Sequence, residues 1–175
     1  TTRIMATADV VPTLSPSMDI QVSSNFERLL LEVNDRDGGM TAEQLRLLRA
    51  TGHLAVGNDQ YEEWLAPVFR GARFDDPDTL GIMRAVHAET GLLVDPHTAV
   101  GIGAARAARE PGVATVALAT AHPGKFPDAV EEATGRRPEL PPHLADLFDR
   151  PERTTVVAND LAAVEAVVAR HGARR

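Results

Sequence analysis

A hydroxyl, an imidazole and an ammonium group fall within six residues, at Thr120, His122 and Lys125. Lys125 is the only lysine of the chain. These residues follow an apolar run, 113–119, that has the length and composition of a buried parallel strand. In open parallel sheets, ligands bind at the carboxyl ends of the strands, so the sequence indicates a binding site in this loop. From spacing alone, an ordinary turn whose polar groups cap the next helix is the favoured alternative, because short motifs often match by chance.

A second cluster of polar side chains, Ser23, Ser24 and Asn25, stands at the start of a predicted helix whose apolar stripe runs from Phe26 to Val33. The free backbone amides at a helix N-terminus form a natural anion site, which these hydroxyl and amide groups could complete. Ser24 and Glu27 are also spaced as a capping box, in which each side chain accepts from the backbone amide of the other residue. Serine and asparagine are favoured helix caps, so capping alone is the favoured interpretation of this cluster.

His97 stands near the start of another predicted helix, in the segment Asp95-Pro96-His97-Thr98. Its imidazole could titrate near neutral pH and face a ligand. A lone histidine at a helix start more often serves as a structural hydrogen-bonding group, and we favour that interpretation for His97.

Other kinds of site are excluded by the spacing of their usual ligands. The segment 35–39 has some features of a calcium loop but lacks the third acidic position and the closing glutamate, so a turn is predicted there. The six histidines show no paired spacing for a metal, and no metal site is predicted. The sequence contains neither a nucleophile elbow nor a phosphate loop.

The elements that must position these residues alternate between helix and strand signals. Helices are predicted from Ser24 to a stop at 37–39, from Thr41 to Gly52, at 59–69, from Asp76 to Gly91, from Asp95 to about Arg109, at 127–134, at 142–148 and after Asn159. The predicted start signals are a second capping box at Thr41–Gln44, caps at Asp76 and Asp95 that are each followed by a proline at the first helical position, and a cap at Asn159. On the last helix, Leu161, Val164 and Val168 are expected to face inward. A short apolar run stands at 53–56, and strands are predicted at 113–119 and 154–158. This alternation predicts an α/β fold with a mostly parallel sheet covered by helices, and the loop 139–142 is the best candidate for a local joint.

Composition limits the classes of function. The formal net charge of −7 argues against a nucleic-acid partner, which would need a concentrated basic face. The absence of cysteine excludes disulfides and thiolate chemistry and fits a reducing compartment, so a cytoplasmic location is expected. All apolar runs fall short of the roughly 18 residues that would indicate a membrane span, so no membrane partner is predicted. With 43% hydrophobic but only 4% aromatic residues, the core must be built largely from Ala, Val and Leu.

Three strings of the sequence together resemble one enzyme family, threonine synthase. The first string is Ser15–Leu29, the second is Thr90-Gly91 followed by Asp95–Gly101, and the third is Thr120–Pro127. They occur in the order of the family and at plausible spacings. The resemblance runs from about residue 8 to the C-terminus, and the chain 1–175 is therefore similar to the C-terminal portion of a threonine synthase.

The resemblance implies a fold-type II pyridoxal-phosphate (PLP) enzyme, a lyase of amino-acid biosynthesis related to the tryptophan synthase β-subunit. The implied reaction converts O-phospho-L-homoserine and water to L-threonine and phosphate, with PLP accepting electrons from the substrate carbanion. The resemblance also implies that the Thr120 hydroxyl bonds the pyridine nitrogen of PLP. Charge-assisted contacts to the substrate phosphate are assigned to two side chains of the same loop, His122 and Lys125. Weaker substrate-side candidates are Ser23, Ser24 and Asn25.

Two features of the family find no match in the chain. The Schiff-base lysine and the Gly- and Asn-rich loop that holds the PLP phosphate both lie in an earlier segment of the family. Lys125 belongs to the later motif and is not assigned the Schiff-base role, so no catalytic residue is predicted here. We therefore expect the chain to need the missing N-terminal part of the same enzyme as a partner, and to be inactive alone.

Two alternatives remain at the level of sequence. The chain could be a non-catalytic small-molecule or protein-binding module that keeps the fold without its cofactor half. A second alternative is another fold-type II enzyme, such as a serine or threonine dehydratase, but those families do not share the Ser15–Leu29 string.

Overall fold

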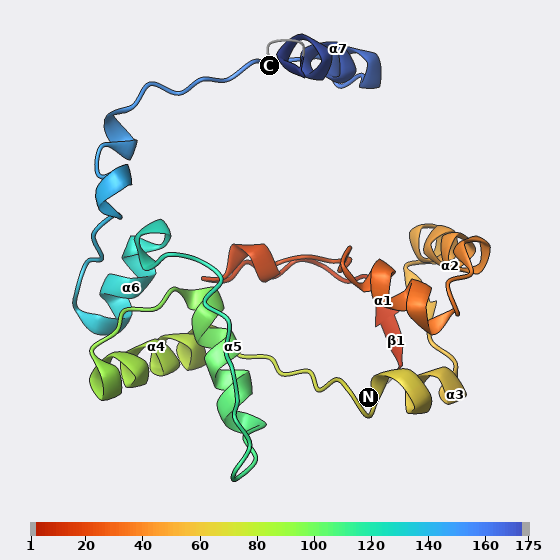
Figure 1. Ribbon diagram of the computed structural model, residues 1–175, viewed down its shortest axis with the longest axis horizontal. Coiled ribbons are helices and arrows are strands. Elements are labelled where there is room, and N and C mark those ends of the chain that lie inside the picture. The colour runs from red at the N-terminus through yellow and green to blue at the C-terminus, as the bar shows by residue number, and fades with distance from the viewer. Residues whose placement is uncertain (1–2, 173–175) are drawn as a thin grey trace. The chain divides into compact units, whose positions relative to one another are not determined.

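The structure, a computed structural model, describes residues 3–172 and divides into two compact units, Thr1–Leu140 and Pro141–Arg175. In chain order, the first unit contains β1 (Ile4–Ala6), a 3-10 turn (Pro16–Met18), α1 (Phe26–Val33), α2 (Gly38–Thr51), β2 (His53–Ala55), α3 (Asn58–Gln60) continued by a π-helical turn (Tyr61–Leu65), α4 (Asp76–Thr90), α5 (Pro96–Ala107), a 3-10 turn (Pro123–Lys125) and α6 (Pro127–Thr134) (Figure 1). The second unit contains two 3-10 turns, Pro142–Leu144 and Leu147–Asp149, and then α7 (Leu161–Gly172).

Several helix boundaries agree with the sequence signals. The predicted extent of α6 is confirmed. The predicted apolar stripe of α1 lies within Phe26–Val33, but the helix ends at Val33, before the stop predicted at 37–39. Asp95 caps α5 and Pro96 takes its first position, as predicted, because proline has no amide hydrogen to leave unpaired there. Gly52 and Gly91 end α2 and α4 with φ angles of 75° and 74°, a left-handed conformation that glycine adopts without a Cβ clash.

Other start signals are wrong. The Ser24 side chain caps nothing, and α1 begins after Asn25 without any side-chain cap. The second predicted capping box fails as well, since α2 begins before Thr41. The Asp37 carboxylate accepts from the Met40 amide at 2.8 Å and caps α2. The first turn of α2 therefore includes two glycines, Gly38 and Gly39.

At the starts of α4 and α7, the residue that caps the helix is adjacent to the residue that the sequence predicted as the cap. Asp75, not Asp76, caps α4 by accepting from the Asp78 amide at 3.0 Å, because the Asp76 carboxylate accepts from the amide of Leu14 instead. Similarly, Asp160 rather than Asn159 accepts from the Ala163 amide at the start of α7.

The mostly parallel sheet is not confirmed in the part of the chain that the structure describes. Its sheet consists of β1 and β2, which pair antiparallel with Ile4 opposite Ala55. The predicted interior strand 113–119 is exposed and has no strand beside it, with Val116 81% exposed. The predicted strand 154–158 is also extended and exposed. A parallel strand needs neighbours that take up its backbone N–H and C=O groups, and none of the described segments supplies them.

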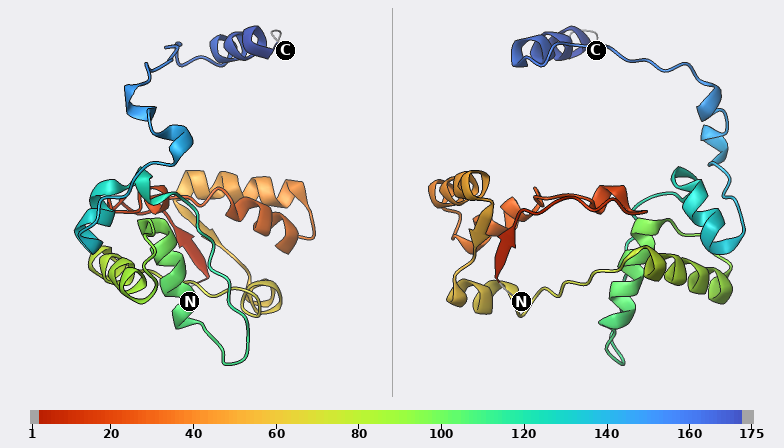
Figure 2. Two further views of the ribbon diagram at one scale, coloured as in Figure 1. Left: turned by 60° about the vertical axis from the view of Figure 1, so that its left-hand side comes forward. Right: turned by 180° about the vertical axis from the view of Figure 1, so that it is seen from behind.

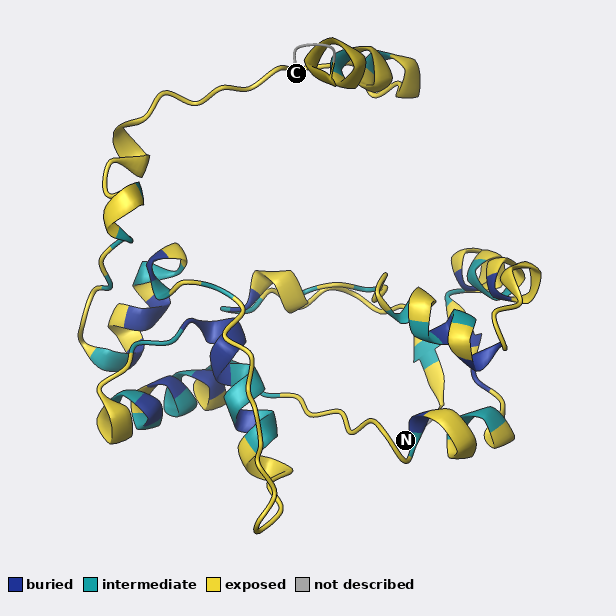
Figure 3. Cartoon of the chain, in the orientation of Figure 1, coloured by how far each residue is buried: buried dark blue, intermediate teal, exposed yellow. Residues whose placement is uncertain are grey.

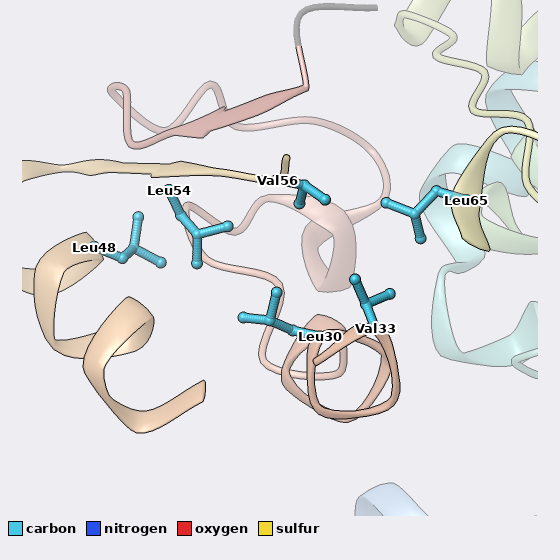
Figure 4. Packing of buried hydrophobic residues seen from close by; sticks show 6 residues of the cluster. All are labelled: Leu30, Val33, Leu48, Leu54, Val56 and Leu65. Carbon is cyan, nitrogen blue, oxygen red and sulfur yellow. The ribbon is translucent and has the colours of Figure 1, made fainter. Parts of the chain in front are cut away.

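Two hydrophobic clusters form the core of the first unit. The first joins α1, α2, β2 and the π-helical turn through Leu30, Val33, Leu48, Leu54, Val56 and Leu65 (Figure 4). The second joins α4, α5 and α6 through Met83, Ala99, Val130 and Ala133. Small residues on α5 allow this close packing: a Cβ added to Gly103 would lie 2.6 Å from Cδ1 of Ile82. In the second unit, the side chains of α7 predicted to face inward, Leu161, Val164 and Val168, are exposed.

The start of α5 is the most buried part of the second cluster, as the dark band in Figure 3 shows. After α5 the chain turns back and runs beside this helix toward Thr120 (Figures 1 and 2), so that the Leu118 carbonyl passes close to Gly101. The α4–α5–α6 packing therefore places the second and third sequence strings next to each other.

Two adjacent leucines of α2 test the first cluster. Leu48 is 2% exposed and Leu47 is 42% exposed. We expect Leu48→Ala to lower the free energy of unfolding by about 2–5 kcal/mol, because it leaves a cavity. Leu47→Ala, the matched control on the same helix, should lower it by less than half as much. Urea unfolding followed by circular dichroism measures both changes, and equal losses would contradict the assigned cluster.

Candidate functional site

The candidate site is organised by Asp95, whose carboxylate is fully buried at the start of α5. Its Oδ1 atom accepts from the His97 amide and from Nδ1 of the His97 ring, both at 2.9 Å. Its Oδ2 atom accepts from the Thr98 amide at 3.3 Å and from the Thr98 hydroxyl. Burial of a carboxylate is costly unless it is hydrogen-bonded, and these four bonds meet that requirement.

The His97 ring links the first and second sequence strings. The backbone amide of Ser17 donates to Nε2 of His97 at 3.2 Å. A ring nitrogen that accepts carries no proton, so the ring is neutral and its proton lies on Nδ1, facing Asp95. The ring also packs at an angle of 52° against Phe126, with centroids 4.7 Å apart. His97 is therefore a structural hydrogen-bonding group, as favoured from the sequence.

The Thr98 hydroxyl links the second and third strings. It donates to Asp95 and accepts from the Thr120 amide at 3.1 Å. Thr98 itself is only 4% exposed, whereas Thr120 is exposed. Within residues 3–172, the side-chain hydroxyl of Thr120 has no hydrogen-bond partner. The backbone of Thr120 is thus anchored while its hydroxyl stays available to a bound small molecule.

The rest of the loop presents two basic side chains at the surface. His122 and Lys125 are both exposed, and Nδ1 of His122 accepts from the Gly124 amide at 3.1 Å. The Lys125 ammonium lies 5.6 Å from the centroid of the Phe126 ring, within the range of a cation–π interaction. Since Phe126 also contacts His97, the loop and the network around Asp95 share one aromatic side chain.

The polar cluster at the start of α1 lies in other surroundings. The Asn25 side-chain oxygen accepts from the Arg28 guanidinium at 2.7 Å, and the backbone carbonyls of Ser23 and Ser24 accept from amides in the first turn of α1. None of the described contacts joins these residues to the loop 120–126. The structure therefore brings together the Ser17 end of the first string with the second and third strings, but not residues 23–25.

Three members of the network were missed as site residues by sequence reasoning, namely Ser17, Asp95 and Thr98. Asp95 was identified only as a helix cap. The available signal was the spacing of an imidazole and a hydroxyl two and three residues after a capping carboxylate, which lets one buried acid bind both side chains. Nothing in the local sequence around Ser17 indicates its partner, which lies 80 residues away in the chain.

A cleft of about 650 Å³ lies beside the 3-10 turn 16–18. Its walls include Ser15, Met18 and Asp19 from the first string and Val100 from α5, but neither Thr120 nor Lys125. One of the three acidic groups that line this cleft, the Asp19 carboxylate, accepts from the amide and the hydroxyl of Thr13.

Ionisable groups with shifted pKa values lie in surface ion pairs outside this network. Hydrogen bonding from Arg46 lowers the pKa of Glu43, and hydrogen bonding from Arg150 lowers the pKa of Asp146. Among residues 3–172, no group of three or more metal-binding side chains gathers. The described helices include none that is long and apolar enough to cross a membrane.

Comparison with known proteins points to one family. The family model described as "Threonine synthase, C-terminal" matches residues 98–168. The chain is 49% identical over 165 residues to a threonine synthase of Pseudomonas aeruginosa, covering 93% of this chain and 35% of that protein. It is 33% identical to a threonine synthase of Methylobacillus glycogenes, covering 97% and 36%. The chain thus spans about a third of the length of the curated relatives it matches.

Solved structures show the same relationship. The PLP-bound threonine synthase from Brucella melitensis superposes with a TM-score of 0.82 and 39% identity, covering 97% of this chain and 36% of that one. The yeast threonine synthase superposes with a TM-score of 0.79 and 26% identity, covering 99% of this chain and 39% of that one.

The tight packing of Gly124 in the loop provides a test of its geometry. A Cβ at this position would lie 3.1 Å from both the Glu139 carbonyl oxygen and Nδ1 of His122. We expect Gly124→Ala to lower the free energy of unfolding by about 1–3 kcal/mol, through overpacking. The control is Gly81→Ala inside α4, where a Cβ meets no atom within 4 Å and the gain in helix propensity should be about 0.5–1 kcal/mol. Chemical unfolding of both variants checks the signs, and an unchanged Gly124→Ala variant would contradict the loop geometry.

Proposed function

We propose that this chain, which belongs to the threonine synthase family and corresponds to its C-terminal region, works as part of a longer PLP-dependent threonine synthase. The proposed reaction converts O-phospho-L-homoserine and water to L-threonine and phosphate. When bound, PLP supplies an electron sink for the substrate carbanion. The proposal is supported by the family match and by the PLP-bound relative, and a cytoplasmic location belongs to the same proposal.

The observation that carries the proposal is the hydrogen bonding and exposure of Thr120. Its amide is held by the buried Thr98 hydroxyl, while its own hydroxyl is exposed and has no partner in the described part of the chain. These features fit a residue that binds a heteroaromatic nitrogen through a neutral hydrogen bond. A hydroxyl, unlike a carboxylate, does not stabilise a protonated pyridine nitrogen. Thr120 would therefore hold the cofactor ring and moderate the electron withdrawal that acts on the substrate.

The substrate phosphate is assigned to the basic side chains of the same loop. His122 and Lys125 are exposed within a few residues of Thr120. Hydrogen bonds from a cationic donor such as the Lys125 ammonium to a phosphate are stronger than neutral ones. His122, whose Nδ1 accepts from the Gly124 amide, would add a hydrogen bond from Nε2. The polar groups at the start of α1, Ser23, Ser24 and Asn25, remain the weaker substrate-side candidates, because no described contact brings them to this loop.

The Schiff-base lysine is assigned to the part of the enzyme outside this chain. Lys125 is the only lysine in the 175 residues, and it belongs to the phosphate-binding loop of the proposal. The role of the chain is then to position groups around cofactor and substrate, and the chain alone is expected to be inactive.

Replacement of Thr120 tests the assigned contact in a full-length enzyme that contains this chain. Thr120→Val keeps the shape of the side chain and removes the hydroxyl, so we expect normal folding, slower phosphate release and weaker PLP binding. Loss of one such hydrogen bond costs about 0.5–1.5 kcal/mol, or up to about tenfold in affinity. Thr120→Ser, which keeps the hydroxyl, is the control. Titration with PLP and an assay of released phosphate measure the effect. Wild-type affinity and turnover in the Val variant would reduce Thr120 to an ordinary turn residue.

The isolated chain tests the assignment of Lys125. After incubation with PLP and reduction with borohydride, we expect no stoichiometric pyridoxyl group on Lys125, because the proposal gives the Schiff-base role to a lysine outside the chain. Digestion and mass spectrometry detect such a group directly. A stoichiometric adduct at Lys125 would contradict the division of roles between this chain and the rest of the enzyme.

A further inference from the structure

Asp95 differs from the other aspartates that cap helices in the first unit. Asp37 and Asp75 are exposed, and the cap bond of each goes to one backbone amide of its own helix. Asp95 is fully buried and binds two side chains as well as two amides. Capping requires only the amides, so the contacts to His97 and Thr98 need a separate explanation.

We infer that Asp95 is a positioning residue of the enzyme. It fixes the position of Thr120 through Thr98, which we call the Thr98 branch, and the position of the turn 16–18 through His97, which we call the His97 branch. The two branches are separate, since each uses its own carboxylate oxygen. The inference rests on the proposed function of Thr120 and deepens it. Asp95 has no exposed surface with which to contact cofactor or substrate, so it acts only through its two partners.

The Thr98 branch depends on the direction of one hydroxyl proton. A hydroxyl has one proton to donate, and Thr98 gives it to Asp95. The lone pairs of the same oxygen are then left to accept from the Thr120 amide. Without the carboxylate, the Thr98 hydroxyl can rotate and donate instead to a backbone carbonyl three or four residues earlier, that of Asp95 or Val94. The anchor of Thr120 then loosens, and the Thr120 hydroxyl loses its fixed position.

The His97 branch depends on the position of the ring proton. Asp95 holds that proton on Nδ1, which leaves Nε2 as an acceptor for the Ser17 amide. Loss of the carboxylate removes the preference for this tautomer, and with a proton on Nε2 the ring can no longer accept from Ser17. The two branches thus predict separate losses of order, one at Ser17 and one at Thr120.

Hydrogen–deuterium exchange in the full-length enzyme tests the two branches without relying on activity. The readout is the exchange rate of short peptides that contain Ser17 or Thr120. We expect Thr98→Val to speed exchange at Thr120 only, and His97→Phe, which keeps a ring but removes Nε2, to speed exchange at Ser17 only. Asp95→Asn should speed exchange at least in the branch that its NH2 group faces, because that side of the side chain no longer accepts a hydrogen bond. Asp75→Asn, the matched cap variant on α4, should speed neither.

A double-substitution cycle tests the link to the cofactor. We expect Thr98→Val to weaken PLP binding by up to about tenfold, as one lost hydrogen bond would. In a Thr120→Val background, Thr98→Val should have little further effect, because its target hydroxyl is gone. Thr98→Ser keeps the hydroxyl and should restore wild-type affinity. Both Thr98 variants leave the cap at Asp95 in place, so they remain informative if Asp95→Asn does not fold.

The outcomes separate this inference from the proposed function. Equal exchange in the Asp95→Asn and Asp75→Asn variants, or additive effects of Thr98→Val and Thr120→Val on PLP affinity, would overturn the positioning role. If Thr120→Val alone leaves PLP affinity unchanged, the proposed contact of Thr120 fails. In that case branch-specific exchange would still show that Asp95 positions both segments. The idea that this positioning helps to bind the cofactor would be refuted.

Discussion

The buried carboxylate of Asp95 is the constraint on which the candidate site depends. A charged group without solvent must be fully hydrogen-bonded, and removal of its partners leaves a penalty of several kcal/mol. Asp95 meets this requirement with donors from only two residues, His97 and Thr98, and the side chain of each also accepts a hydrogen bond from a backbone amide, that of Ser17 or Thr120. One desolvated charge thereby holds segments that lie 80 and 22 residues apart in sequence.

The hydrophobic packing serves this network by bringing α5 close to its neighbours. The second cluster uses alanine and glycine on α5, so that α4 and α6 approach the helix that carries Asp95. A chain with few aromatic residues achieves density in this way, through close approach of backbones. The buried end of α5 and the loop after 119 are then held by packing and hydrogen bonds together.

Exposed apolar segments are the second feature with a bearing on function. Residues 113–119 and 154–158 have the composition of interior strands, yet the structure leaves them extended at the surface. Strand-like apolar segments with unpaired backbone groups are normally covered in a finished protein. Their state fits a chain that spans about a third of its relatives and whose proposed activity needs the rest of the enzyme.

The sequence by itself determined what local chemistry encodes: the apolar stripe of α1, the extent of α6, the glycine ends of α2 and α4, and the three strings that resemble the family. It could not choose between adjacent caps, because Asp75 and Asp76 differ only in that Asp76 has a distant partner, the amide of Leu14. Nor could it show whether strand-like segments find partners, since a strand is completed by another segment. Only the tertiary structure decided that Asp95 is more than a cap. The hydrogen bonds from Ser17 to His97 and from Thr120 to Thr98 join residues far apart in the chain, and no local pattern of the sequence predicts such contacts.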